Sequence, residues 1–159
     1  MIRPLRAAWI RWSGIDFFLL LRVFLFAAAV PGLLRLRLPT LQRLLGRLAV
    51  GRAADPATIQ AILRCMTIVL RRGRPLVRRG CLTRGVTLFY FLRRAGLDVD
   101  LCFGAGSLGG EFAAHCWLER EGVPFLEDVD PRGIFAEMYR VPSAVPEPAH
   151  RAEIARLPR

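Results

Sequence analysis

Two residues that could form a catalytic nucleophile and its base, Cys81 and His115, lie well apart in this chain. Cys81 opens the amphipathic run Cys-Leu-Thr-Arg-Gly-Val-Thr-Leu-Phe, and His115 lies in the strand-like run Ala-His-Cys-Trp-Leu-Glu. A thiol at a helix N-terminus and an imidazole on a strand are the two halves of a cysteine-nucleophile site. Three carboxylates follow the histidine closely enough to orient it: Glu127, Asp128 and Asp130.

The sequence around Cys81 suits a reactive thiol. A helix N-terminus carries partial positive charge and free N–H groups, and both favour the thiolate form of a cysteine. Arg78, Arg79 and Arg84 add positive charge nearby. The backbone N–H of Cys81 could also donate to an oxyanion, while His115 would accept the thiol proton and return it to a leaving amine.

The hairpin expected after His115 predicts which carboxylate orients it. If Glu121-Gly122 is a two-residue turn, cross-strand pairing places His115 opposite Asp128, on the same face of the sheet. A bulge or a different loop would bring in Glu127 or Asp130 instead. The chain contains no Asn, so the orienting group is expected to be a carboxylate.

The hydrophobic periodicity predicts an α+β fold, with helices first and an antiparallel β-meander after them. Helices are expected over residues 17–30, 40–50, 56–72 and 81–94. Strands are expected over residues 97–103, 112–119 and 123–128. The glycine-rich stretch Gly104–Gly110 is interpreted as a loop, either a mobile lip over the cleft or a flexible connection. A short amphipathic piece should follow Pro131.

Charge divides the chain unequally. Residues 1–94 carry 18 Arg against two acids, a net of +16, whereas residues 95–159 carry 6 Arg against 11 acids. We expect a basic helical region over 1–74, a catalytic core over 75–141 and a Pro-rich tail over 142–159, with 15–141 folding as one unit. The basic half indicates an anionic partner. A nucleic acid is not expected, because the arginines alternate with Leu and no nucleic-acid motif is present.

Cysteine usage and hydropathy indicate a reduced, cytoplasmic protein. The four cysteines form no CxxC pair and no signal peptide precedes them. Their spacing does not suit zinc, and we expect neither a metal nor a cofactor. The apolar stretch 17–34 is broken by Arg22 and Pro31, which favours a buried or interfacial helix over a membrane span. Its flanking arginines would suit peripheral contact with an anionic membrane.

The segments around Cys81 and His115 resemble a known family. The runs CLTRGVTLFYFLRRAGLDVDLCFGAG and FAAHCWLEREGVPFLEDVDP are similar to the transglutaminase-like cysteine proteases of lasso peptide biosynthesis. These are the B2 leader peptidases, which belong to the microcin J25-processing protein C-terminal domain family. The likeness covers about residues 75–130 and includes a Cys-Leu at the helix start and a His-x-Trp-Leu-Glu run.

This resemblance implies a transglutaminase/papain-like core, with the nucleophile helix packed on the β-meander. It implies a bacterial hydrolase that removes the leader from a ribosomally made, post-translationally modified peptide (RiPP), with Cys81 as nucleophile and His115 as base. The family's usual acid lies about twelve residues past the histidine, at Glu127, whereas strand pairing favours Asp128, which we rank first. A separate leader-recognition (B1) protein would present the precursor, and a lasso cyclase would act beside it. The chain leaves no room for a fused recognition domain ahead of its helical region, so a discrete peptidase is expected.

Two alternatives use the same residues differently. A transglutaminase-like acyl transferase would employ the same Cys–His–acid set and deliver the acyl group to an amine instead of water. A non-catalytic, membrane-associated scaffold of the biosynthetic complex would keep Cys81 as a buried thiol and His115 as a hydrogen-bonded core histidine.

Overall fold

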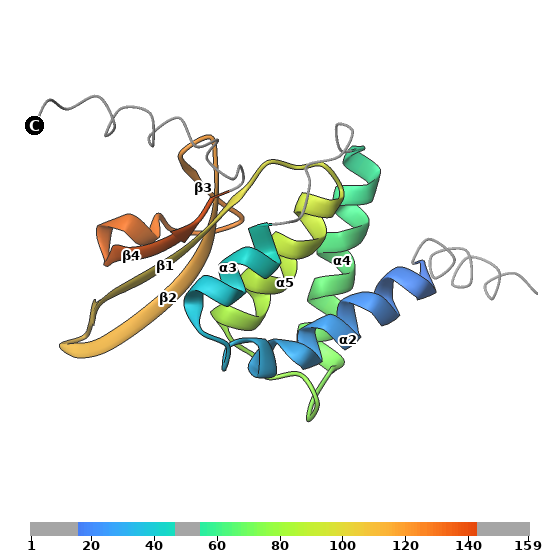
Figure 1. Ribbon diagram of the computed structural model, residues 1–159, viewed down its shortest axis with the longest axis horizontal. Helices are drawn as coiled ribbons and strands as arrows, with labels where there is room; N and C mark the ends of the chain where they lie inside the picture. Colours follow the sequence, from blue (N-terminus) through green and yellow to red (C-terminus); the bar gives the residue numbers. More distant parts are fainter. Residues whose placement is uncertain (1–15, 47–54, 143–159) are drawn as a thin grey trace, which may run out of the picture.

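The structure, a computed structural model, describes residues 16–46 and 55–142, which form an α+β fold with helices packed on one side of an antiparallel sheet (Figure 1). The sheet has the strand order β3-β2-β1-β4. The predicted order, helices and then a meander, is confirmed. The elements are α2 (Phe17–Leu33), α3 (Leu38–Gly46), α4 (Pro56–Arg72), α5 (Cys81–Arg94), β1 (Asp100–Leu108), β2 (Glu111–Arg120), β3 (Val123–Phe125), the 3-10 helix η1 (Pro131–Gly133) and β4 (Phe135–Val141).

Aspartate side chains cap the starts of α2 and α4. Asp16 accepts from the backbone N–H groups of Phe18 at 2.9 Å and Leu19 at 3.3 Å. Asp55 accepts from the N–H of Thr58 at 3.2 Å. Each cap satisfies donors that have no partner inside the helix, so these starts could be read from the sequence.

Helix α2 continues past its predicted stop. Pro31 lies inside the helix, which ends at Leu33. The N–H of Leu34 still donates to the carbonyl of Val30 at 2.9 Å, so the proline costs the helix only one bond in its last turn. Within the described ranges, no helix combines the length and apolarity needed to cross a membrane.

Helix α5 is the central element of the fold. It lies between the sheet on one side and α2 and α4 on the other (Figure 1). Val86, Phe89 and Leu92 on its apolar face are fully buried, whereas Leu82 is exposed. The left-handed Gly96 follows the helix, with its N–H bonded to the carbonyl of Arg93. The helix that begins at Cys81 is therefore held by packing on two sides.

The predicted loop over residues 104–110 is wrong. Strand β1 runs through Leu108, and Gly109 and Gly110 form the turn into β2, with φ of 63° and 87°. The two-residue turn suits glycine because both positions are left-handed. The stretch is therefore a hairpin of two long strands, and the mobile lip that the glycines suggested is absent from this part of the chain.

The remaining glycines of this stretch permit close approach. A Cβ at Gly104 would lie 2.7 Å from the Trp117 ring, and one at Gly106 would clash with the backbone carbonyl of Ile134. That carbonyl immediately precedes β4, which pairs with β1 along its length. The amphipathic piece expected after Pro131 is this fourth strand, and the glycines of β1 make room for it.

The second hairpin follows its predicted register only in part. Leu118 pairs with Phe125, which matches a two-residue turn at Glu121-Gly122. Strand β3 then ends at Phe125, three residues earlier than predicted, because Leu126 adopts a left-handed φ of 65°. The first half of β2 is therefore not paired with β3.

Two predictions concern residues outside the described ranges. The end of the helix predicted over 40–50 and the Pro-rich tail from residue 143 lie outside them. The division of the chain at residue 74 stays a prediction.

The close approach at Gly106 predicts a stability effect. Gly106→Ala should lower the free energy of unfolding by about 1–3 kcal/mol, because the new methyl group meets backbone that cannot rotate away. Chemical denaturation measures the change. Gly133→Ala is the matched control, since a Cβ there meets nothing within 4 Å. Equal unfolding midpoints for the two variants would contradict the packing described.

Candidate active site

Cys81 is the first residue of α5, and its thiol is half-buried. The preceding Gly80 offers no side-chain cap, so the N–H groups of the first turn keep no side-chain partner. The loop before the helix is fixed by Arg79, whose guanidinium donates to the carbonyls of Leu70 and Arg71 at 2.6 Å each. These bonds tie the position of the thiol to the end of α4.

His115 lies in β2, where it pairs with Gly104 of β1. Its ring stacks on Trp117 with centroids 6.1 Å apart and contacts Phe135 at 5.2 Å. The side chain is 23% exposed. Aromatic rings on two sides restrict the rotation of the imidazole, so one ring edge is presented in a defined direction.

Glu127 meets that edge of the ring. Its Oε2 lies 3.1 Å from His115 Nε2, and its Oε1 accepts from Arg84 at 2.6 Å. Arg84 also donates to the backbone carbonyl of Leu126. The Glu127 side chain is 12% exposed, so the carboxylate is held on both oxygens in a partly buried position. Such a carboxylate can orient an imidazole and stabilise its charged form.

The ranking of Asp128 ahead of Glu127 is corrected by this geometry. Strand pairing stops at Phe125, and the left-handed Leu126 redirects the chain so that Glu127 turns toward His115. Asp128 is exposed.

The third candidate acid belongs to a different contact. Asp130 caps η1 and bonds Arg132 through its side chain, which lowers the pKa of Asp130 to about 2. It is exposed and does not reach His115. Among the three acids considered, Glu127 is the one that the structure brings to the histidine.

The role of Arg84 was not apparent from the sequence. It had been counted as local positive charge near Cys81, whereas it links α5 to Glu127. The available signal was its spacing, because residues three apart on a helix share a face. Arg84 comes three residues after Cys81, so it lies on the same face of α5 as Cys81, and its side chain reaches Glu127.

The ion pair between Arg84 and Glu127 links the helix that begins at Cys81 to the carboxylate that lies against His115. No hydrogen bond joins the thiol to the imidazole among the described residues. The helix and strand do pack tightly one turn further on, where a Cβ at Gly85 would lie 2.7 Å from Cys116 Sγ. Catalytic hydrogen bonds are often longer without substrate than with it. Because β3 pairs only with residues 118–120 of β2, it does not cover the edge of β2 beside His115.

The other three cysteines are poor nucleophiles. Cys65, Cys102 and Cys116 are all buried. Burial raises the pKa of each thiol, to about 12 for Cys102. For Cys116 the charge of Cys81 acts in the same direction. Cys81 is the cysteine that an external reagent or substrate can reach.

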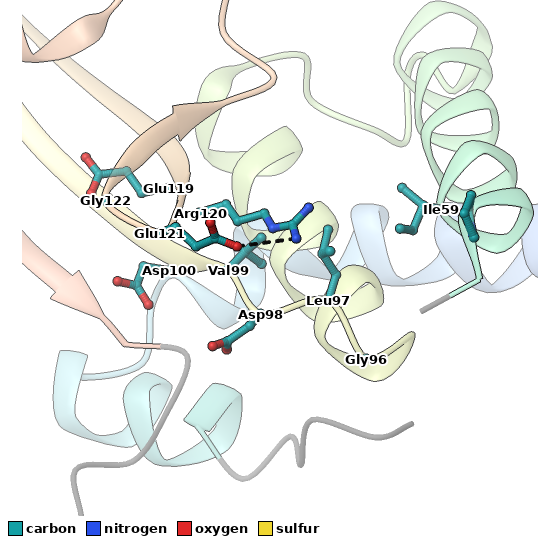
Figure 2. A pocket seen from close by; sticks show the side chains of 11 residues that line it. Ile59, Gly96, Leu97, Asp98, Val99, Asp100, Glu119, Arg120, Glu121 and Gly122 are labelled. Atoms are coloured by element: carbon teal, nitrogen blue, oxygen red, sulfur yellow. Dashed lines mark ion pairs between the residues drawn. The ribbon is translucent and has the colours of Figure 1, made fainter. Parts of the chain in front are cut away.

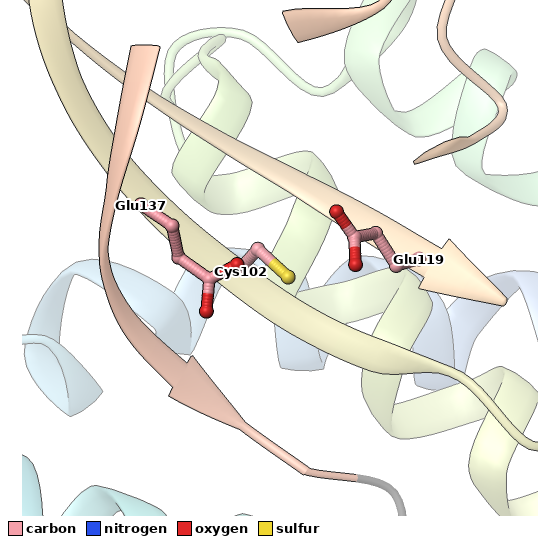
Figure 3. A group of neighbouring side chains, drawn as sticks. All are labelled: Cys102, Glu119 and Glu137. Atoms are coloured by element: carbon pink, nitrogen blue, oxygen red, sulfur yellow. The ribbon is translucent and has the colours of Figure 1, made fainter. Parts of the chain in front are cut away.

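One group of side chains could in principle hold a metal. Cys102, Glu119 and Glu137 project from neighbouring strands with their ligand atoms within 4.8 Å of one another (Figure 3). Arg140 already donates to Glu119 at 2.7 Å and to Glu137 at 2.5 Å, and the Trp117 indole donates to Glu119. Carboxylates neutralised by arginine beside a protonated thiol form an ion-pair network, which fits a cation poorly.

A separate cavity lies away from His115. It has a volume of about 550 Å³ and sits where β1 begins and β2 ends, with Ile59 of α4 across from it (Figure 2). Asp98 and Glu121 line it, and Arg120 pairs with Glu121 at 3.4 Å. None of the residues of the Cys81–His115 site lines this cavity.

A helix-borne thiol beside a sheet that carries a histidine–carboxylate pair is the arrangement of papain-like and transglutaminase-like folds. A family model described as Transglutaminase-like superfamily matches residues 26–140, so the chain belongs to the Transglutaminase-like superfamily. Its fold is common among cysteine peptidases and acyltransferases. The match begins within α2 and takes in the later helices as well as the sheet. No curated protein and no solved structure matches the chain.

The burial pattern predicts selective alkylation. Iodoacetamide at neutral pH should modify Cys81 in the folded protein and leave the three buried cysteines intact, because burial restricts access to those three and raises the pKa of their thiols. Peptide mapping by mass spectrometry locates the label. In denaturant all four cysteines should react. Labelling of Cys102 or Cys116 at the rate of Cys81 in the native protein would contradict this burial.

Proposed function

We propose that this chain is a cysteine peptidase that removes the leader from a lasso peptide precursor. The observation that carries the proposal is the His115–Glu127 pair, held by Arg84 from the same helix that presents Cys81. Superfamily membership supports the cysteine chemistry. The likeness of residues 75–130 to the leader peptidases supports the substrate class.

The proposed reaction begins at the sulfur of Cys81. The thiolate attacks the scissile carbonyl, and the resulting oxyanion accepts from the backbone N–H of Cys81 at the start of α5. Protonated His115 gives its proton to the leaving amine as the C–N bond breaks, which leaves a thioester. His115 then takes a proton from water, whose oxygen attacks the thioester and releases the carboxylate and the thiol.

In the proposed mechanism, the two nitrogens of His115 have different tasks. Nε2 faces Glu127, so Nδ1 is the atom that remains to exchange protons with Cys81. Glu127 holds the ring and stabilises the imidazolium. Because Arg84 occupies the other carboxylate oxygen, Glu127 keeps this orientation while the ring charges and discharges.

The partners remain part of the proposal. A separate leader-recognition protein would present the precursor, and the arginines of the helical half offer a surface for it or for an anionic membrane. We place the protein in the cytoplasm beside the lasso cyclase. Binding to the recognition protein and precursor that does not weaken with salt would argue against docking on the basic half.

The deciding experiment follows the fate of the acyl group. The purified protein, a precursor peptide and its recognition protein are incubated in ¹⁸O-labelled water, and the products are weighed by mass spectrometry. Hydrolysis puts one ¹⁸O into the carboxylate of the free leader, whereas acyl transfer gives an unlabelled amine adduct. Cys81→Ala and His115→Ala should both abolish release. Release by Cys81→Ala would rule out the peptidase, and partner binding without any release by wild type would favour a scaffold.

The identity of the acid gives a separate prediction. Glu127→Gln should lower kcat by about 10²–10⁴-fold, the usual contribution of a group that supports general acid–base catalysis. The matched change, Asp128→Asn on the next residue, should leave kcat within a few-fold, because Asp128 is exposed. Steady-state release rates measure both. Equal losses in the two variants would contradict the assignment of Glu127.

A further inference from the structure

A second cleft opens beside Cys81. It has a volume of about 420 Å³, within the range of about 300–1,000 Å³ of ordinary ligand pockets. Three segments form it: the end of α2, the loop before α5 and the first turn of α5. Since Cys81 itself lines the cleft, a peptide bound at the thiol would place neighbouring residues in it.

The walls of this cleft combine apolar surface with arginine. Pro31, Leu34 and Leu82 contribute the apolar part. Arg35 and Arg78 contribute exposed guanidinium groups from two different segments, and no acidic residue lines the cleft. An apolar floor with cationic groups at its rim fits a short aliphatic stem that ends in a carboxylate.

The two guanidinium groups are not committed elsewhere in residues 16–46 and 55–142. Neither Arg35 nor Arg78 forms an ion pair there. Arg79, the third arginine of the cleft, is engaged with the end of α4. Arg84 on the same helix face as Cys81 is engaged with Glu127. The charge that remains for a ligand is therefore that of Arg35 and Arg78.

Among residues 16–46 and 55–142, no carboxylate pairs with either guanidinium group, and Glu127 is already bound by Arg84. The acids of the basic half, Asp16 and Asp55, cap the starts of α2 and α4, whereas the cleft lies at the far end of α2. The N-terminus of α5 adds its own positive end to the same space. The local field thus favours a negative group close to the reacting sulfur.

We propose that this cleft is a specificity subsite that binds a carboxylate of the peptide substrate within a few residues of the scissile bond. Arg35 and Arg78 are its specificity-determining residues. The inference rests on the proposed peptidase function for its substrate. The carboxylate is that of an Asp or Glu side chain or that of a peptide C-terminus, and the two sources can be separated by experiment.

The first arm of the test needs no peptidase activity. Iodoacetate and iodoacetamide alkylate the same thiol, and they differ in carrying or lacking a carboxylate. The rate with iodoacetate divided by the rate with iodoacetamide should be higher at Cys81 than for N-acetylcysteine. It should fall about five-fold in Arg35→Gln/Arg78→Gln, in line with the loss of two exposed ion pairs. Added salt should lower the ratio for wild type.

A matched control removes the same charge elsewhere. Arg64→Gln/Arg94→Gln changes one exposed residue in the middle of α4 and one at the far end of α5, about 20 Å along the helix from Cys81. Its rate ratio should stay at the wild-type value. A ratio that is the same in the cleft variant and in this control would overturn the subsite, whether or not the protein cleaves peptides.

The second arm uses peptides. Precursor variants in which each Asp or Glu near the cleavage position becomes Asn or Gln, and versions with an amidated C-terminus, identify the carboxylate. For the wild-type enzyme, one of these changes in the precursor should lower kcat/KM. For Arg35→Gln/Arg78→Gln, kcat/KM should be the same for the changed and the unchanged precursor. If Arg35→Gln/Arg78→Gln still preferred the precursor that carries the carboxylate, the proposal would be overturned. Absence of all cleavage would count against the peptidase function and leave the alkylation ratio to decide the subsite.

Discussion

The ion pair between Arg84 and Glu127 is the interaction on which the geometry of the site depends. It joins α5, which begins at Cys81, to the turn that supplies the carboxylate for His115. The pair is partly shielded, and the second hydrogen bond to Leu126 fixes the turn itself. If Arg84 were lost, the partly buried carboxylate of Glu127 would have His115 as its remaining partner. Breaking such an ion pair lowers the stability of the protein more than breaking a solvent-exposed one. Arg84 thus links the helix that begins at Cys81 to the carboxylate that lies against His115.

This interaction works because the helix and sheet around it cannot shift. Helix α5 is buried on both sides. At Gly85 it approaches β2 so closely that the Cys116 thiol fills the space that a side chain at position 85 would need. On the opposite face of the sheet, Arg140 ties β4 to β1 and β2 by binding three carboxylates. A site built on regular elements that are packed and bonded in this way holds its geometry better than one built on loops.

Local rules predicted the parts of the fold that depend on neighbouring residues. The aspartate caps, the glycine after α5 and the two-residue turn at Glu121-Gly122 each follow from backbone chemistry that is visible in the sequence. The errors arose where distant segments decide. A leucine in a left-handed conformation carries no sequence mark, so the turn at Leu126 and the choice of Glu127 could not be foreseen. Likewise, the glycines of β1 are typical of a loop in the sequence, whereas in the fold they leave room for the Trp117 ring and for the backbone that leads into β4.

The distribution of charge in the fold bears on how a substrate would reach Cys81. Among the described acids of the second half, three are bound by Arg140 of β4 and Asp130 is bound by Arg132, while Asp98 and Glu121 line the cavity at the far end of the sheet. They therefore do little to cancel the positive charge of the helical half near the cleft. Screening over about 10 Å at ordinary salt separates the two regions further. An anionic peptide would be drawn to the side of the molecule that holds the thiol, and it would be repelled from the acidic end of the sheet. The same asymmetry that identifies the helical half as basic in the sequence thus gives the approach of a substrate a direction.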